Sequence, residues 1–227
     1  MEKDIVYFVK ESESNEELRY SLRTLKNFPH RYVWFYGGCP KGLQPDCHVK
    51  VIQDKVNKWQ NVSTMLDMAC KNPKISKEFW LFNDDFFIMN KVLHPVNYFS
   101  GDLYKRIVQL EDKHGGITQY SSELRKMCQE LEALGCSSKN YAVHFPMLIN
   151  RKKALELLNT TDNPMFRSLY GNYANVKAEW TNDCKIVSKE KEWKGSNYLS
   201  TEDNAFDDGR VGQQIRERFP DKCKYEL

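Results

Sequence analysis

At positions 79–87 the sequence reads FWLFNDDFF, an apolar run that passes through one amide and two acids and then becomes apolar again. Residues 79–82 predict a buried strand, because a continuous apolar run of this length is typical of a covered sheet. Asn83, Asp84 and Asp85 then follow the carboxyl end of that strand. Since α/β proteins bind ligands at the carboxyl ends of parallel strands, this run is the first candidate for a functional site.

The residues before this run alternate between strand and helix patterns. Apolar runs predict strands at 5–9, 32–36 and 48–52. Leucines spaced like one face of a helix follow the first strand, with Ser14 and Glu17 as the expected capping box. A second helix is expected around 62–69. This alternation predicts an α/β fold with a mostly parallel sheet and flanking helices.

The second half of the chain has weaker patterns. We expect helices at 124–134, 154–158 and 211–219 and strands at 142–149 and 183–187. No repeat or low-complexity linker divides the sequence, so residues 1–227 are predicted to form a single domain.

Composition narrows the class of protein. The formal net charge of +3 over 227 residues is smaller than the basic excess usual in a dedicated nucleic-acid binder. No apolar run approaches the roughly 18 residues needed to span a bilayer, and the N-terminus has no signal-peptide pattern. The seven cysteines are scattered without a CxxC pair, which predicts reduced thiols. We therefore expect a cytoplasmic protein without a membrane span.

The acidic run is suited to a metal ion. Carboxylates among aromatic side chains are costly unless something neutralises them, and Mg²⁺ or Mn²⁺ prefers oxygen ligands. Asp84 and Asp85 are the candidate ligands, with Asn83 beside them. The alternative is a solvated turn between two strands.

Two further segments are candidates for nucleotide binding. The first follows the first strand and opens a helix, where backbone N–H groups favour phosphate. The second follows the third strand, where Lys58 would pair with a phosphate and Trp59 would stack on a ring. The alternatives are helix caps with surface charges, and a buried tryptophan with solvated lysines. The candidate contacts are Val9, Glu11, Glu16, Arg19, Lys58, Asn61 and, beside the acidic pair, Asn83.

Three residues of the second half are candidates for catalysis. His144 lies in an apolar segment and would either complete the metal shell, transfer a proton or serve the core. Arg167 would hold a phosphate through its planar fork, or end a helix. Asp183 is either a general base or a turn residue.

Several blocks resemble a known family. The segments DIVY (4–7), NEELRYSLRTL (15–25) and FNDDFF (82–87) resemble conserved blocks of the Stealth family, whose members transfer a hexose 1-phosphate from a nucleotide sugar to an acceptor. Their order also resembles the GT-A glycosyltransferase fold, in which an acidic motif binds Mn²⁺ or Mg²⁺ and the donor diphosphate. The later blocks VHFP (143–146), RSLYGN (167–172) and LSTED (199–203) look like those of short phage and prophage relatives.

The resemblance implies a metal-dependent glycosyltransferase with a GT-A-like fold and a UDP-sugar-type donor. Residues 1–90 would form the nucleotide-sugar-binding half and residues 91–227 the acceptor-side half. Asp84, Asp85 and His144 would hold Mn²⁺ or Mg²⁺. The acceptor is left open between a glycan, a teichoic polymer and a hydroxymethylated base in phage DNA, and a phage-encoded protein would act in the host cytoplasm. The alternatives are a Stealth-type sugar-phosphate transferase and a non-catalytic nucleotide- or sugar-binding module.

Overall fold

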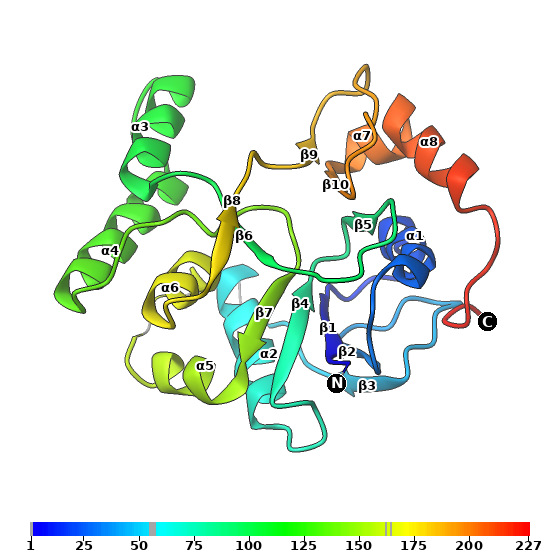
Figure 1. Ribbon diagram of the computed structural model, residues 1–227, viewed down its shortest axis with the longest axis horizontal. Coiled ribbons are helices and arrows are strands. Elements are labelled where there is room, and N and C mark those ends of the chain that lie inside the picture. The colour runs from blue at the N-terminus through cyan, green and yellow to red at the C-terminus, as the bar shows by residue number, and fades with distance from the viewer. Residues whose placement is uncertain (1, 55–57, 162, 164) are drawn as a thin grey trace.

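The computed structural model describes residues 2–54, 58–161, 163 and 165–227. At its centre lies a five-stranded sheet in the order β3-β2-β1-β4-β7 (Figure 1). Neighbouring strands are parallel except that β7 runs antiparallel to β4. The strands are β1 (Asp4–Val9), β2 (Val33–Gly37), β3 (Cys47–Lys50), β4 (Glu78–Phe82) and β7 (Met147–Asn150).

Helices cover both faces of this sheet. Helix α1 (Glu16–Thr24) and the short 3₁₀ helix η1 (Leu25–Asn27) connect β1 to β2. Their leucines pack with Ile5, Tyr7 and Val9. Helix α2 (Lys58–Lys71) connects β3 to β4 and packs with Val6 on the opposite face. Because side chains alternate along a strand, β1 is buried from both sides. Helix α5 (Arg151–Leu158) packs beside α2.

The remaining elements form two groups at the carboxyl edge of the sheet (Figure 1). One contains the helices α3 (Leu103–His114), α4 (Gln119–Ala133) and α6 (Phe166–Tyr173), with the strand pair β6 (Asn97–Phe99) and β8 (Ala178–Trp180). The other contains the sheet β5-β10-β9 and two helices. Its elements are β5 (Phe86–Ile88), β9 (Lys185–Ile186), β10 (Tyr198–Thr201), α7 (Asp203–Asp207) and α8 (Arg210–Arg218).

The α/β class, the mostly parallel sheet with flanking helices and the single compact domain agree with the sequence prediction. Two local predictions are wrong. The cap of α1 is Asn15 rather than Ser14, because the extended backbone of Asn15 lets its side chain accept a hydrogen bond from Leu18 N. The strand expected at 142–149 begins only at Met147, because the backbone N–H of His144 is bonded to the Asp183 side chain instead of a neighbouring strand.

No helix in the described part of the chain is long and apolar enough to cross a membrane. All seven cysteines are free thiols.

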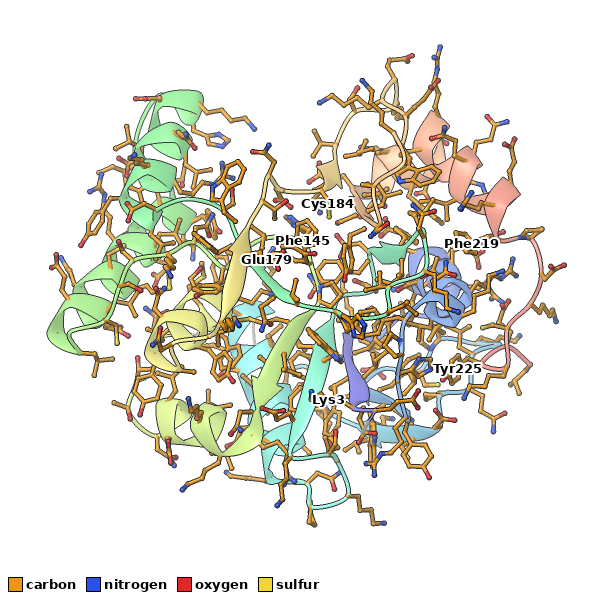
Figure 2. The ribbon with its side chains drawn as sticks, viewed as in Figure 1. Lys3, Phe145, Glu179, Cys184, Phe219 and Tyr225 are labelled. Carbon is orange, nitrogen blue, oxygen red and sulfur yellow. The ribbon has the colours of Figure 1, made fainter. Side chains whose placement is uncertain are left out.

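The C-terminal segment holds α1 in place. Figure 2 shows this segment, with Phe219 and Tyr225 labelled, on the same side of the molecule as α1. The side chain of Glu226 is fully buried and bonds Arg23 Nε at 2.7 Å and Arg19 Nη1 at 3.2 Å. Burial alone would raise the pKa of Glu226, but the hydrogen bonds from these arginines outweigh it and lower that pKa to about 2.

The Glu226 ion pair predicts a pH-dependent contribution to stability. We expect Glu226→Gln to lower the free energy of unfolding by about 2 to 3 kcal/mol at neutral pH, below the range for fully buried pairs because both arginines reach solvent. The folded-state pKa lies below the ordinary 4.5, so this loss should shrink as the pH falls from 4.5 toward about 2.

Urea unfolding of both proteins at several pH values measures this difference. Glu2→Gln, at an exposed position, is the control and should leave stability unchanged. A loss that stays constant between pH 7 and pH 3 would contradict the ion-pair explanation.

Candidate functional site

A cleft of about 1140 Å³ lies across the carboxyl ends of the central strands. Strand β1 has β2 on one side and β4 on the other, so the chain reverses its direction across the sheet between these two strands. Ligands of open α/β sheets bind in the crevice at such a switch point. The cleft is lined by the β1–α1 loop, the start of α2, the acidic run after β4, and parts of α4, α6, β9 and α7.

Asp85 is the most buried acid of this cleft, with 8% of its surface exposed. Its Oδ2 accepts hydrogen bonds from Ser200 Oγ at 2.8 Å and from Lys185 Nζ at 3.2 Å. Its Oδ1 is buried and has no hydrogen-bond partner within the described part of the protein. A buried carboxylate oxygen without a partner costs free energy, which makes this atom the candidate contact for a ligand.

Asp84 lies beside it and faces the helix that follows β1. Its Oδ2 accepts a hydrogen bond from Asn15 Nδ2 at 2.8 Å. Burial raises the pKa of Asp84, and the neighbouring charge of Asp85 raises it further. Ionisation of Asp84 is therefore disfavoured in these surroundings, whereas the charge of Asp85 is paired with the Lys185 ammonium.

Arg167 places a cation on the other side of the acidic run. Its guanidinium donates to Asn83 Oδ1 at 3.1 Å and to the carbonyl oxygen of Phe145 at 2.8 Å, and lies 5.2 Å from the centre of the Phe86 ring. Burial lowers the pKa of Arg167 to about 10, although Asp85 and Asp183 act against that shift. At neutral pH the side chain is a cation that lines the cleft.

Glu17 is a site residue that the sequence analysis did not identify. The pattern assigned it to a capping box, but the structure directs it into the cleft, where Thr201 Oγ1 donates to its Oε1 at 2.7 Å. Burial raises the pKa of Glu17 to about 8, with further contributions from Asp85, Asp84 and Asp203. The local sequence gives no sign of this role, because Thr201 and Asp203 lie far along the chain.

His144 and Asp183, two of the predicted catalytic residues, are in direct contact. His144 Nδ1 lies 2.7 Å from Asp183 Oδ2, and the backbone N–H of His144 donates to Asp183 Oδ1 at 3.0 Å. Burial opposes the charge of Asp183, but the bonds from His144 lower its pKa below the ordinary value. Cys184 Sγ donates to the His144 carbonyl, and Figure 2 shows Cys184 near Phe145 at the centre of the view. Asp183 thus orients an imidazole that lines the cleft.

Some of the predicted nucleotide contacts line the cleft and others do not. Glu16, Lys58, Asn61 and Asn83 line the cleft. The other three lie outside its lining. The Val9 side chain is buried in the core, Glu11 is exposed to solvent, and the Arg19 guanidinium is paired with Glu16 and Glu226.

The predicted three-ligand metal shell is not assembled. Among residues 2–54, 58–161, 163 and 165–227, no group of three or more His, Cys, Asp or Glu side chains is arranged to hold a metal ion. The Nδ1 atom of His144, the predicted third ligand, is engaged by Asp183. Metal binding by Asp84 and Asp85 stays a prediction.

No protein-family model matches the sequence, and a search of curated proteins finds no match.

The pKa of Glu17 predicts a stabilising substitution. The folded-state pKa of Glu17 is raised from the ordinary 4.5 to about 8. The free energy of unfolding should therefore fall as the pH rises from 4.5 to about 8, because the unfolded chain ionises Glu17 more readily than the folded one. We expect Glu17→Gln, which keeps an oxygen to accept from Thr201, to gain about 0.5 to 2 kcal/mol at a pH above 8. The gain should vanish near pH 4.

Thermal unfolding at both pH values measures the gain. Glu13→Gln, an exposed change on the same loop, is the control. If Glu17→Gln and wild type are equally stable at high pH, burial and the neighbouring acids do not destabilise the ionised Glu17 carboxylate.

Proposed function

We propose that the protein is a metal-dependent glycosyltransferase of the GT-A type, which transfers a sugar from a nucleotide-sugar donor of the UDP-sugar class to an acceptor hydroxyl. The observation that carries the proposal is the buried Asp85 carboxylate, whose Oδ1 has no partner in the described structure, at the switch point of the sheet. Asp84, with its raised pKa, adds a second acid at the same place.

These two acids fit a hard divalent cation. Mg²⁺ is usually held by one or two carboxylates together with substrate phosphates, so a third protein ligand is not required. Asp85 would contribute its unpartnered Oδ1 and Asp84 its carboxylate. When bound, the cation would neutralise the charge of the departing diphosphate. The cations of Lys185 and Arg167 would add fixed positive charge along the same cleft.

The start of α2 suits the nucleotide end of the donor. Lys58 and Asn61 line the cleft there, together with Gln53 and Lys10 from the ends of β3 and β1. These side chains combine ammonium groups for phosphate with amides that hydrogen-bond a base. The donor would then extend from α2 to the acidic run.

The His144–Asp183 pair fits the proton transfer that the reaction needs. The acceptor oxygen forms a bond to the anomeric carbon, while the bond from that carbon to the diphosphate oxygen breaks and its electron pair leaves with the diphosphate. The acceptor proton passes to the Nε2 atom of His144. Asp183, bonded to Nδ1, orients the ring and stabilises the charge that it gains.

Arg167 favours a second candidate, the Stealth-type transfer of a sugar 1-phosphate. Its guanidinium bonds an amide and a carbonyl rather than a carboxylate, so its charge is available to a phosphoryl group. In that reaction the acceptor oxygen attacks the phosphorus next to the sugar, and the nucleoside monophosphate leaves. Phosphorus on the acceptor product would establish this reaction in place of glycosyl transfer. Donor binding without turnover would identify a non-catalytic binding module.

Metal dependence tests the proposed site directly. We expect wild type to bind UDP in calorimetry with Mn²⁺ present and to lose that binding in EDTA. Asp85→Asn should weaken Mn²⁺-dependent binding at least tenfold, a change of about 1.4 kcal/mol. Asp67→Asn, at a surface ion pair on α2, is the matched control and should bind like wild type. Equal UDP affinity with Mn²⁺ and with EDTA would contradict the proposal.

A further inference from the structure

Lys185 links the buried acid Asp85 to the open cleft. It belongs to β9, which pairs in parallel with β10 so that Lys185 lies opposite Ser200. Both side chains bond the same atom, Asp85 Oδ2, Lys185 at 3.2 Å and Ser200 at 2.8 Å. The side chain of Asp85 is 11% exposed, whereas that of Lys185 is 21% exposed and lines the cleft. The ammonium is therefore within reach of both the buried acid and a ligand in the cleft.

A divalent cation at Asp85 would stand close to this ammonium. The unpartnered Oδ1 and the lysine-bound Oδ2 belong to one carboxylate. With a metal–oxygen bond of about 2.1 Å, a cation on Oδ1 would lie within about 8 Å of Lys185 Nζ. This separation does not exceed the Debye length at physiological salt, so the two positive charges would repel with little screening. Lys185 and the cation would thus compete for the charge of Asp85.

The diphosphate of a nucleotide-sugar donor would relieve this competition. Lysine carries its charge on a flexible four-carbon stem, so its ammonium can turn from a carboxylate to a phosphate oxygen. Ser200 would keep its hydrogen bond to Asp85 and hold that carboxylate in place. Arg167 is not placed for the same exchange, because its guanidinium bonds Asn83 and the Phe145 carbonyl rather than Asp85.

From this geometry we propose that Lys185 couples the binding of the divalent cation to the binding of the donor. Without a donor, Lys185 pairs with Asp85 and weakens cation binding, and with a donor it turns to the diphosphate and leaves Asp85 to the cation. This inference rests on the proposed function and names a regulation of the same site. Coupling between two ligands is reciprocal, so Lys185 also makes nucleotide binding depend more strongly on the cation.

Mn²⁺ binding tests the coupling, followed through the electron paramagnetic resonance signal of free Mn²⁺ with and without UDP. Lys185→Met removes the competing charge, so it should lower the Kd for Mn²⁺ alone at least tenfold. The factor by which UDP raises Mn²⁺ affinity should be at least fivefold smaller in Lys185→Met than in wild type. Lys185→Gln, which keeps an amide donor for Asp85, should give the same shifts and replaces Lys185→Met if that variant does not fold.

Two further variants separate charge from hydrogen bonding. Ser200→Ala removes a hydrogen bond to the same oxygen of Asp85 without removing a charge, and it should change the Kd for Mn²⁺ less than twofold. Lys189→Met removes an ammonium that pairs with Asp208 and lies outside the cleft lining, so it should bind Mn²⁺ like wild type.

The outcomes distinguish the role of Lys185 from the proposed function. If wild type binds Mn²⁺ with UDP but Lys185→Met shows the wild-type affinity for Mn²⁺ alone, the coupling role is overturned and the proposed metal site stands. A gain in Ser200→Ala as large as that in Lys185→Met would also overturn it, because competition by charge would not be the cause. If wild type binds no Mn²⁺ even with UDP, the proposed function fails and the role of Lys185 fails with it.

Discussion

The burial of one carboxylate, that of Asp85, is the constraint on which the site depends. Its Oδ2 accepts hydrogen bonds from Ser200 of β10 and Lys185 of β9, which lie 115 and 100 positions further along the chain. Strands β9 and β10 must therefore pack against the acidic run before Asp85 can be buried. Burying a charge is costly unless it is paired, and one oxygen of Asp85 is left unpaired in the described structure. The fold thus retains an unfavourable group where a ligand would be most strongly attracted.

This electrostatic cost extends along α1 and is offset elsewhere in the fold. Glu17, at the start of the helix, is held among Asp84, Asp85 and Asp203 with a pKa of about 8. Further along the same helix, Arg19 and Arg23 bond the buried side chain of Glu226. These ion pairs stabilise the docked helix and offset the cost of burying Glu17 among the acids of the cleft. Functional sites commonly carry local instability that the surrounding structure offsets.

Local patterns were sufficient for the first half of the fold and insufficient for the site. Continuous apolar runs and a leucine stripe predict β1, β2, β4 and α1, because the three strands are almost entirely buried and one face of α1 packs on the sheet. Helix α3 was missed although Asp102 caps its start and Gly115 its end, so a signal was present. Helix α6 has a weaker helix pattern in its sequence, because it contains a glycine, which packs on the Tyr141 ring, and an asparagine, which bonds the Lys139 carbonyl. The partners of Glu17 and His144 depend on contacts 184 and 39 positions apart, which no local pattern encodes.

The same long-range contacts give the cleft its two chemically different sides. The early strands supply the acidic run at the centre, and the C-terminal sheet with α7 adds Thr201 and Asp203 on one side. The segment between β4 and β9 supplies α4 and α6, which add aromatic and apolar side chains together with Arg167, and α2 adds Trp59, Val62 and Met65. A charged leaving group and an uncharged ring make opposite demands on their surroundings, since one needs compensating charge and the other needs apolar surface with a few polar contacts. In the proposed reaction the acids would face the departing charge, and His144, held by Asp183, would face the acceptor. This arrangement supports the proposed transfer of a group between two dissimilar substrates.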